Sequence, residues 1–250
     1  MIFLKRIVMA GITGRTGKAV ANVLRRLDDC QIVAAVGKNS AGRDIGELLE
    51  GKSNFRYIYP DVPSALEKTD ADVYIDFTAP DAAQKNAVSA AKHGLDIIIG
   101  TTGLTKESVE CIAELLREEN RFGIIASNFS IGIAAMVKMG NILREYYGGE
   151  ELQIIEKHHT SKRDCPSGTA LYLQQQLDLT EDAIIAKRVA EKASYHEIKF
   201  AAQNENLSIS YEVTGREVFG EGVAYILRNM PNSGVYYDFI SFIEHIEKRK

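Results

Sequence analysis

The sequence predicts an α/β protein in which a Rossmann-like, doubly wound parallel sheet is accompanied by a second, smaller α+β domain. Three observations support this fold class. Short apolar runs alternate with longer helical stretches through the first half of the chain, a glycine-rich turn follows the first of these runs, and the strict alternation ends after Asn128. Alternation of strands and helices is typical of parallel sheets, whereas its loss indicates a domain of another architecture.

The strands predicted in the first half are short apolar runs, as expected for strands that helices cover on both faces. They lie at residues 7–10, 32–36, 73–77, 97–99 and 122–126. Helices are predicted between them, for example at residues 18–27, 82–93 and 106–119. This alternation implies a parallel, doubly wound sheet.

The second half follows a different order. Its predicted elements are a helix at 133–147, a strand at 152–158, a helix at 167–177 and strands at 198–200 and 207–213. Because strands and helices no longer alternate strictly, these elements indicate an α+β domain. The tail, residues 237–250, has apolar and charged residues at helical spacing and is predicted to pack back on the first domain.

Composition limits the possible functions. The chain has 250 residues, of which 45% are hydrophobic and 26% charged, with a formal net charge of −4. A chain of this length can bury a sizeable core, and the absence of a large basic block argues against nucleic acid as a partner. The three cysteines, Cys30, Cys111 and Cys165, are far apart, which favours a reducing cytoplasm. We expect no signal peptide and no membrane helix.

The glycine-rich turn, Gly11 to Gly17, reads GITGRTG between the first predicted strand and the first helix. A tight turn at this place directs backbone N–H groups and the positive end of a helix at a pyrophosphate. Thr13 replaces the middle glycine of the usual G-x-G-x-x-G fingerprint, so the match is partial. The turn predicts dinucleotide binding; the alternative is a plain strand-to-helix turn.

The end of the second predicted strand bears on the choice of cofactor. An acidic residue there usually binds the 2′-hydroxyl of NAD. The segment reads VGKNS at residues 36–40 and lacks a carboxylate. Lys38, with Arg15 as a second cation, would suit a 2′-phosphate, so we expect NADPH to be used at least as well as NADH. The alternative is that Lys38 is a solvated loop residue.

Three further loops follow predicted strands. They read DFTAP at residues 76–80, GTTG at 100–103 and ASNFS at 126–130. The carboxyl ends of strands in an open α/β sheet border its ligand crevice, so these loops are expected to line the cofactor site.

The segment EKHHTSKRDCPSGTA spans residues 156–170. Neighbouring strand residues point to opposite faces, so His158 and His159 are not expected to bind one metal ion, and no metal site is predicted. Ser167 is predicted to cap a helix whose free N–H groups, with Lys162 nearby, suit a carboxylate. The alternative is a capped helix after a polar loop.

With these motifs the chain resembles the 4-hydroxy-tetrahydrodipicolinate reductase family, also called dihydrodipicolinate reductase, of bacterial and plant lysine biosynthesis. The family signature is close to E-x-H-H-x-x-K-x-D-A-P-S-G-T-A, and residues 156–170 match it at most fixed positions. The segments GITGRTG, DFTAP, IGTTGLT and SNFSIGI occur in the same order as similar family segments.

The resemblance implies the reduction of a cyclic unsaturated dicarboxylate to tetrahydrodipicolinate by a reduced pyridine nucleotide, with loss of water. It implies that His158 is the acid, that Lys162 is the second proton donor, and that His159, Ser167, Gly168 and Thr169 bind substrate. The expected cofactor-binding residues are Gly11, Ile12, Thr13, Gly14, Arg15, Thr16, Lys38, Phe77, Gly100, Thr101, Thr102, Ala126, Ser127, Asn128 and Phe129.

The resemblance also implies a domain division and an assembly. Residues 1–128 plus 217–250 would form the dinucleotide-binding domain, and residues 129–216 the substrate-binding and oligomerisation domain. A homotetramer assembled through the sheet of the second domain is expected.

Several positions depart from the family pattern. Cys165 stands in place of the usual Ala, Gly37 in place of a common acidic residue, and Tyr211-Glu212 in place of a His and a basic residue. Residues 178–206 form a shorter segment than usual and lack its glycine-rich stretch. These differences concern the second sheet and the assembly more than the chemistry.

Three other functions are compatible with parts of the sequence. Tyr195 and Lys199 match the Tyr-x-x-x-Lys pair of short-chain dehydrogenases, but they lie in a polar stretch outside the expected helix. A sensor that only binds NADP(H) would not need His158, Lys162 and the Ser-Gly-Thr turn together. A sister reductase acting on a related imine or keto acid would share all of these features.

Overall fold

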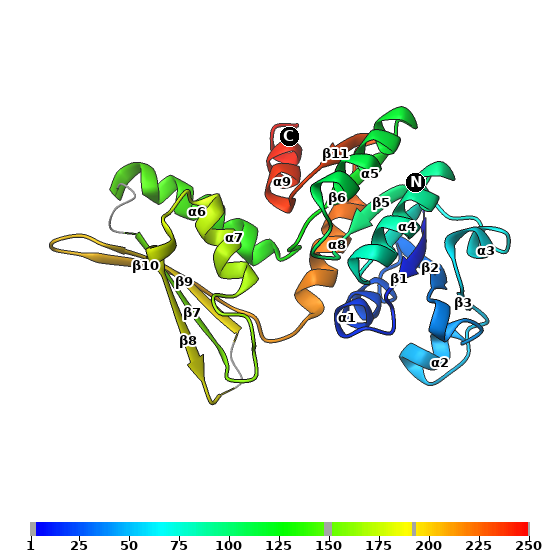
Figure 1. Cartoon of the computed structure of the whole chain (residues 1–250), viewed down its shortest axis with the longest axis horizontal. Coiled ribbons are helices and arrows are strands. Elements are labelled where there is room, and N and C mark those ends of the chain that lie inside the picture. The colour runs from blue at the N-terminus through cyan, green and yellow to red at the C-terminus, as the bar shows by residue number, and fades with distance from the viewer. Residues whose placement is uncertain (1–3, 148–151, 192–193, 250) are drawn as a thin grey trace. The chain divides into compact units, whose positions relative to one another are not determined.

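The computed structural model describes residues 4–147, 152–191 and 194–249. The chain forms two compact units, one from Met1–Phe129 and Arg216–Lys250 and the other from Ser130–Gly215. The end of the chain therefore belongs to the same unit as its beginning. Each unit contains its own sheet (Figure 1).

The first unit has a seven-stranded sheet in the order β11-β6-β5-β4-β1-β2-β3. Every neighbouring pair in it is parallel. The strands are β1 (Lys5–Ala10), β2 (Cys30–Val36), β3 (Ile58–Tyr59), β4 (Val73–Asp76), β5 (Asp96–Ile99), β6 (Phe122–Ile125) and β11 (Gly234–Tyr236). This order of parallel strands, with flanking helices, confirms the predicted Rossmann-like sheet.

The helices of the first unit follow the strands in alternation. They are α1 (Arg15–Leu24), α2 (Ile45–Glu50), α3 (Val62–Leu66), α4 (Pro80–Lys92), α5 (Lys106–Glu118), α8 (Glu217–Asn229) and α9 (Phe239–Glu247), with a short 3₁₀ turn at Lys38–Ser40. Side-chain N-caps stabilise the first turn of several of these helices. At α5, the Thr105 side chain accepts a hydrogen bond from Ser108 N, and at α9, the Asp238 side chain accepts one from Ser241 N.

The C-terminal segment completes the first unit. Helix α8 packs against α1, where a Cβ at Gly220 would lie 2.7 Å from Val23, so only glycine permits this approach. The predicted helix in the tail is α9, and its Phe242 ring lies 5.8 Å from the Phe122 ring of β6. The prediction that the tail packs on the first domain is confirmed.

The second unit has a four-stranded mixed sheet in the order β10-β9-β7-β8. Strand β7 pairs in parallel with β8 and antiparallel with β9. The elements are α6 (Ile131–Tyr147), β7 (Leu152–His159), α7 (Gly168–Gln176), a 3₁₀ turn (Glu181–Ala183), β8 (Ile184–Val189), β9 (Ser194–Ala201) and β10 (Asn206–Glu212). The buried residues of β7 alternate with exposed or partly exposed ones, because one face of the sheet is covered.

Three strands were not predicted. Strand β3 has two residues and β11 three, too few for an apolar pattern to be recognised. Strand β8, with Lys187 and Arg188, is a partly exposed edge strand. Strand β9 is longer than the predicted 198–200. The prediction missed its first half, because that half is polar.

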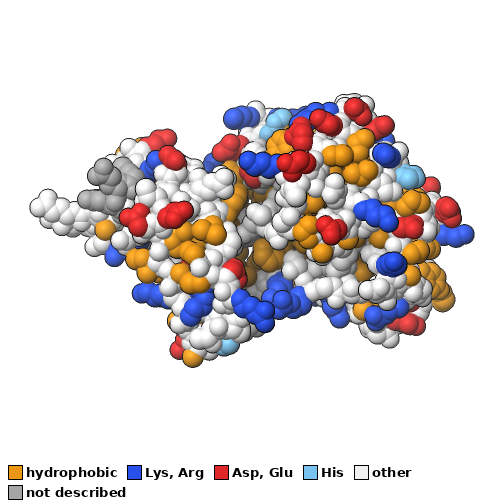
Figure 2. All heavy atoms as spheres, viewed as in Figure 1, with side chains coloured by type: hydrophobic (Ala, Val, Ile, Leu, Met, Phe, Trp, Pro, Cys, Tyr) orange, Lys and Arg blue, Asp and Glu red, His pale blue; other side chains and the backbone are white. Residues whose placement is uncertain are grey.

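The surface is mixed in charge. On the face shown in Figure 2, Lys and Arg side chains are interspersed with Asp and Glu side chains, in line with the small net charge of −4. Within the described residues, no helix combines the length and apolar character that a membrane span requires.

Candidate functional site

The glycine-rich turn connects β1 to α1 as predicted. Gly11 has φ +83°, and a Cβ there would lie 2.2 Å from the carbonyl oxygen of Phe77, so this position requires glycine. Gly14 N donates to Gly11 O at 2.9 Å, which closes the turn just before α1 begins at Arg15. Since the first N–H groups of a helix have no intrahelical acceptor, the turn offers free donors to an anion.

A cavity of about 260 Å³ lies in the first unit beside this turn. Its lining residues are Thr16, Phe77, Thr78, Gly100, Thr101, Thr102, Ser127, Phe129 and Phe219. Seven of these nine were predicted from the sequence; Thr78 and Phe219 were not. Thr78 lies within the DFTAP loop already singled out, whereas Phe219 comes from α8, far away in the sequence.

A buried hydrogen-bond network fixes one wall of this cavity. The carboxylate of Asp76, at the end of β4, is fully buried and accepts hydrogen bonds from the hydroxyls of Thr78 and Thr101, each at 2.6 Å. It also accepts from Thr78 N at 2.9 Å and from the Tyr74 hydroxyl. The Asp76 carboxylate therefore links the loop that follows β4 to the loop that follows β5.

Gly100 allows the Phe77 ring to lie in this wall. A Cβ at Gly100 would be 2.2 Å from the Phe77 ring. The ring in turn packs edge-on against Phe129, with centroids 6.1 Å apart. The cavity wall thus depends on a residue without a side chain.

The other eight predicted cofactor residues are not among those that line this cavity. Ile12 and Ala126 are buried, whereas Thr13, Gly14 and Arg15 are exposed on the turn. Asn128 follows Ser127 directly. Lys38 is exposed in the 3₁₀ turn after β2, and no carboxylate stands at residues 36–40.

A larger cavity of about 590 Å³ lies near α2, where Gly42, Asp44 and Ser53 contribute to its lining. The carboxylate of Asp44 already accepts hydrogen bonds from the Ser53 hydroxyl and from three backbone N–H groups. These polar groups stabilise the loop, so we assign no chemistry to this cavity.

The histidine pair of the second unit lies at the end of β7. His158 is buried and His159 partly exposed, so the two side chains lie on opposite faces, as the strand period predicts. His159 Nδ1 lies 2.7 Å from the Ser161 hydroxyl and accepts from Ser161 N at 3.1 Å. The two rings therefore have different surroundings.

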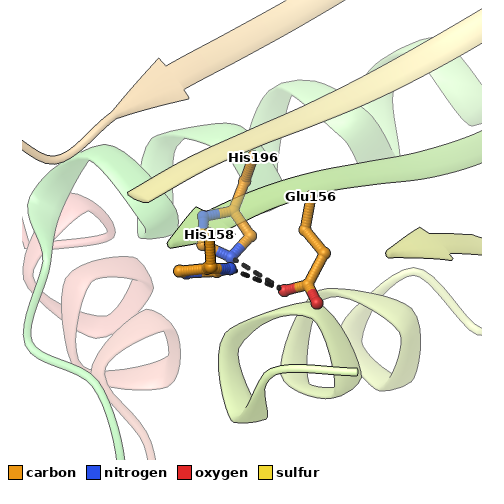
Figure 3. Close-up of side chains that lie close together, drawn as sticks. All are labelled: Glu156, His158 and His196. Atoms are coloured by element: carbon orange, nitrogen blue, oxygen red, sulfur yellow. Dashed lines mark ion pairs between the residues drawn. The ribbon is translucent and has the colours of Figure 1, made fainter. Parts of the chain in front are cut away.

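His158 belongs to a buried cluster with Glu156 and His196 (Figure 3). His158 Nδ1 lies 3.2 Å from Glu156 Oε2, and His196 Nε2 lies 3.9 Å from the same oxygen. The exposed fractions are 0% for Glu156, 7% for His158 and 2% for His196. His196 was missed because only the pairing of β9 with β7 brings it opposite Glu156.

The electrostatics of this cluster are set by burial and by neighbouring charges. Burial lowers the pKa of His158, and it lowers the pKa of His196 to about 4. Burial alone would raise the pKa of Glu156, but hydrogen bonds from Ser167 and Arg188 bring it below its usual value. Glu156 is therefore a carboxylate at neutral pH, beside two imidazoles.

The three side chains also have the ligand types of a zinc site. Two observations argue against this reading. Arg188 Nη1 lies 3.1 Å from Glu156 Oε1, and the charge of Lys162 already acts on both imidazoles. Two neighbouring cations disfavour a third, and we assign no metal to the cluster.

The predicted carboxylate cradle lies at the start of α7. Ser167 caps this helix, its hydroxyl accepting from Ala170 N at 3.1 Å. A Cβ at Gly168 would meet nothing within 4 Å, so the first turn is open there. The N-cap prediction is confirmed.

A protein carboxylate already contacts this cradle. Lys162 Nζ lies 2.8 Å from Asp164 Oδ2. The pKa of Asp164 is lowered, chiefly by Lys162 and to a smaller extent by the N–H of Gly168. Asp164 therefore interacts with two of the groups that the sequence predicts for the substrate.

The Tyr-x-x-x-Lys reading is wrong for this chain. Tyr195 and Lys199 lie on strand β9 rather than on a helix, and four residues along a strand span roughly 13 Å. The Tyr195 hydroxyl donates to Glu197 at 2.8 Å. The pair cannot act as it does in short-chain dehydrogenases.

The chain is similar to known reductases over nearly its whole length. A relative from Methanosarcina barkeri named 4-hydroxy-tetrahydrodipicolinate reductase is 31% identical over 257 residues, which cover 92% of this chain and 96% of the relative. A relative of the same name from Methanocaldococcus jannaschii is 29% identical over 262 residues, covering 94% and 96%.

Solved structures show the same fold. Dipicolinate-bound dihydrodipicolinate reductase from Paenisporosarcina sp. TG-14 has a TM-score of 0.83 at 22% identity and covers 96% of this chain and 99% of its own. A probable dehydrogenase from Thermotoga maritima has a TM-score of 0.67 at 11% identity and covers 98% and 97%.

Two family descriptions account for most of the sequence. "Dihydrodipicolinate reductase, N-terminus" matches residues 5–129, and "Dihydrodipicolinate reductase, C-terminus" matches residues 132–243. The resemblance predicted from the motifs is thereby confirmed. The chain belongs to the dihydrodipicolinate reductase family of NAD(P)H-dependent oxidoreductases.

Proposed function

We propose that the protein reduces 4-hydroxy-tetrahydrodipicolinate to tetrahydrodipicolinate with NAD(P)H, in the diaminopimelate route to lysine. In the net reaction the substrate gains a hydride and a proton and loses water, while the reduced nicotinamide becomes oxidised. Both family matches and the relatives of that name support this function. The protein must therefore bind a dinucleotide, bind a dicarboxylate and deliver a proton.

One observation carries this function further than family membership alone. In the second unit, the signature residues come together as a buried imidazole, an ammonium and the open first turn of a helix. His158 lies at the end of β7, and Lys162 lies in the loop that leads to Ser167, the cap of α7. A proton donor beside a carboxylate site is what the reduction requires.

The first unit is suited to the dinucleotide. The turn at Gly11 leaves no room for a side chain, and the cavity of about 260 Å³ beside it is lined by residues from the ends of β4, β5 and β6. When bound, NAD(P)H supplies the hydride. The N–H groups at the start of α1 would bind the pyrophosphate, and Thr101 and Thr102 would border the rest of the cofactor.

NADPH is proposed to serve at least as well as NADH. Lys38 follows β2 in an exposed turn, and Arg15 is exposed at the start of α1. The carboxylate that would select the 2′-hydroxyl of NADH is missing at residues 36–40. Two cations without a competing carboxylate favour a 2′-phosphate.

The second unit is proposed to bind the dicarboxylate. Dipicolinate, a planar dicarboxylate, is bound by the similar reductase from Paenisporosarcina. In this chain Ser167, Gly168 and Thr169 would take one carboxylate, with Lys162 balancing its charge. His159 would provide a further contact. Because Asp164 already interacts with Lys162 and Gly168, the substrate must compete with this internal carboxylate.

His158 is proposed to protonate the anion that develops on the substrate, and Lys162 to act as the second donor. An imidazole ordinarily titrates near neutral pH; burial lowers the pKa of His158, but the carboxylate of Glu156 opposes this effect, so the ring can supply and recover a proton in each cycle. The ammonium of Lys162 adds positive charge beside the developing anion.

We also propose a cytoplasmic homotetramer that assembles through the sheet of the second unit.

The test is substrate-dependent oxidation of NADPH, followed by its absorbance, with 4-hydroxy-tetrahydrodipicolinate made enzymatically in the same cuvette. Turnover that yields tetrahydrodipicolinate supports the proposal. Binding of NADPH without turnover would indicate a sensor instead. Turnover only with another cyclic imine or keto acid would indicate a sister reductase.

A further inference from the structure

Glu156 is a fully buried carboxylate in the proposed active site that the reaction chemistry does not itself require. Its side chain is 0% exposed on β7, between the apolar Ile154 and the proposed acid His158. Burying a charge is costly unless hydrogen bonds compensate it. The groups around its two oxygens therefore bear on its role.

The two oxygens of Glu156 have different surroundings. Oε1 accepts hydrogen bonds from Ser167 N at 3.0 Å and from Arg188 Nη1 at 3.1 Å. Oε2 accepts none from the residues that the structure describes. Instead it faces His158 Nδ1 at 3.2 Å and His196 Nε2 at 3.9 Å (Figure 3). Oε1 therefore anchors the carboxylate, and Oε2 can accept a hydrogen bond from an imidazole.

His158 Nδ1 and Glu156 Oε2 lie within ion-pairing distance of each other, but they do not form a hydrogen bond in the structure. His158 Nδ1 is buried and has no hydrogen-bond partner among the described residues, as is also true of Glu156 Oε2. Two complementary atoms 3.2 Å apart, both without a partner, need only a small rotation of the imidazole to form an N–H···O bond. Within the described part of the chain, the hydrogen-bond contact of His158 Nε2, the other ring nitrogen, is a long one of 3.5 Å with the Ser194 hydroxyl.

Several charged groups face His158 from the surrounding elements. Burial, Lys162 from the loop after β7 and Arg188 from β8 all lower its pKa. Glu156 on its own strand opposes them most strongly, followed by Asp164 from the loop. From β9, His196 is mainly neutral at pH 7 because burial brings its pKa to about 4. Glu156 is therefore the chief group that favours the protonated form of His158.

We propose that Glu156 is a positioning residue of the reductase, holding the Nδ1–H of His158 through Oε2 so that the proton given to the substrate leaves from Nε2. This inference rests on the proposed function. The imidazolium donates its Nε2 proton to the substrate anion and becomes a neutral imidazole that keeps its proton on Nδ1. Solvent then restores the Nε2 proton. Through Oε1, the same carboxylate connects the acid to Ser167 at the start of the carboxylate cradle.

The first experiment is an NMR titration of ¹⁵N-histidine-labelled protein, which requires no activity. In the wild type, neutral His158 is expected as the Nδ1–H tautomer. In Glu156→Gln, the pKa of His158 is expected to fall by about one unit or more, since an opposite charge within a few ångströms has been removed. Glu197→Gln is the matched control, because it removes one carboxylate from the other face of β9. An Nε2–H tautomer in the wild type, or an unchanged pKa in Glu156→Gln, would overturn the proposal.

The second experiment is a pH profile of kcat and KM. Glu156→Gln is expected to shift the alkaline limb of kcat to lower pH by about one unit and to lower kcat ~10-fold or more near pH 7, with both KM values changed less than about threefold. Glu156→Asp, which keeps the charge, should recover part of the loss. A Glu156→Gln enzyme whose KM rises while its pH profile stays in place would show a purely structural role.

These two experiments separate the inference from the proposed function. If the wild type turns over no substrate, the proposed function fails, while the titration still tests the contact between Glu156 and His158. If Glu156→Gln does not fold, the tautomer of His158 in the wild type decides the question alone.

Discussion

Glu156 on β7 and His196 on β9 are direct register partners, and both side chains lie on the buried face of the second sheet. Cross-strand partners interact closely. A carboxylate opposite an imidazole usually favours the protonated ring. Here burial outweighs this effect, and the pKa of His196 falls to about 4. The consequence can be measured as a dependence of stability on pH.

The free energy of unfolding is expected to fall as the pH drops from about 6.5 towards 4, in part because of His196. Its pKa is about 4 in the folded protein and near 6.5 when unfolded, so the unfolded state binds the proton more readily between these values. The contribution is fully present above pH 6.5 and amounts to roughly 3 kcal/mol. Urea unfolding of His196→Asn should show a shallower pH dependence, whereas His93→Asn, at an exposed position, should not.

His158→Gln is expected to lower kcat by ~100-fold or more while KM changes little, because a general acid acts mainly in the transition state. Steady-state kinetics at saturating NADPH measure both parameters. His159→Gln is the paired variant: its side chain lies on the other face of β7, so KM for the dicarboxylate should rise without a comparable loss of kcat. An unchanged kcat in His158→Gln would contradict the acid role.

Lys162→Ala is expected to damage both kcat and KM, since it removes a proton donor and the charge that would balance a substrate carboxylate. The affinity for dipicolinate, measured by calorimetry, should fall by ~10-fold or more. Lys157→Ala is the control, because the Lys157 ammonium lies over the Tyr195 ring, 4.7 Å from its centroid, rather than beside Asp164 and the start of α7. An unchanged affinity of Lys162→Ala for dipicolinate would contradict the proposal that Lys162 and the start of α7 bind a substrate carboxylate.

Lys38→Ala is expected to lower kcat/KM for NADPH by ~10-fold and to leave NADH nearly unaffected, because it removes one charge-assisted contact to the 2′-phosphate. The ratio of the two kcat/KM values is the readout. Lys68→Ala, an exposed lysine after α3, should leave the ratio unchanged. A wild-type enzyme with a clear preference for NADH would refute the assignment of Lys38.

Gly100→Ala and Gly168→Ala are expected to differ in stability. A Cβ at Gly100 would lie 2.2 Å from the Phe77 ring, so the ring must move, at a cost of ~1–3 kcal/mol. A Cβ at Gly168 would meet nothing within 4 Å, so the free energy of unfolding should change by less than about 0.5 kcal/mol. Urea unfolding measures both, and NADPH affinity should also fall in Gly100→Ala. Equal stability of the two variants would refute the packing argument.

The fold of the first unit was largely predictable from local sequence. Buried parallel strands contain continuous apolar runs, and β4, β5 and β6, which are buried throughout, contain such runs beside Asp76 in β4 and Asp96 in β5. Strands β3 and β11 are too short for such a signal. Strand β8 is an edge strand with Lys187 and Arg188, whose polarity suits solvent rather than a core.

The candidate site was predictable only where its residues are neighbours in sequence. The segment from Glu156 to Thr169 contains the histidines, the lysine and the helix cap, so their types and spacing could be read together. His196 and Arg188 join them only through strand pairing, and Phe219 joins the first unit's cavity from α8. No local pattern specifies such long-range contacts.

The discontinuous first unit has a consequence for synthesis on the ribosome. Strand β6 has its outer neighbour only when β11 pairs with it, and α1 has its packing partner only when α8 arrives. The intervening residues 130–215 form a unit of their own and leave the exit tunnel earlier. We therefore expect the nascent N-terminal portion to keep an unpaired strand edge until residues 216–250 have left the tunnel, a state in which chaperone binding would be most useful.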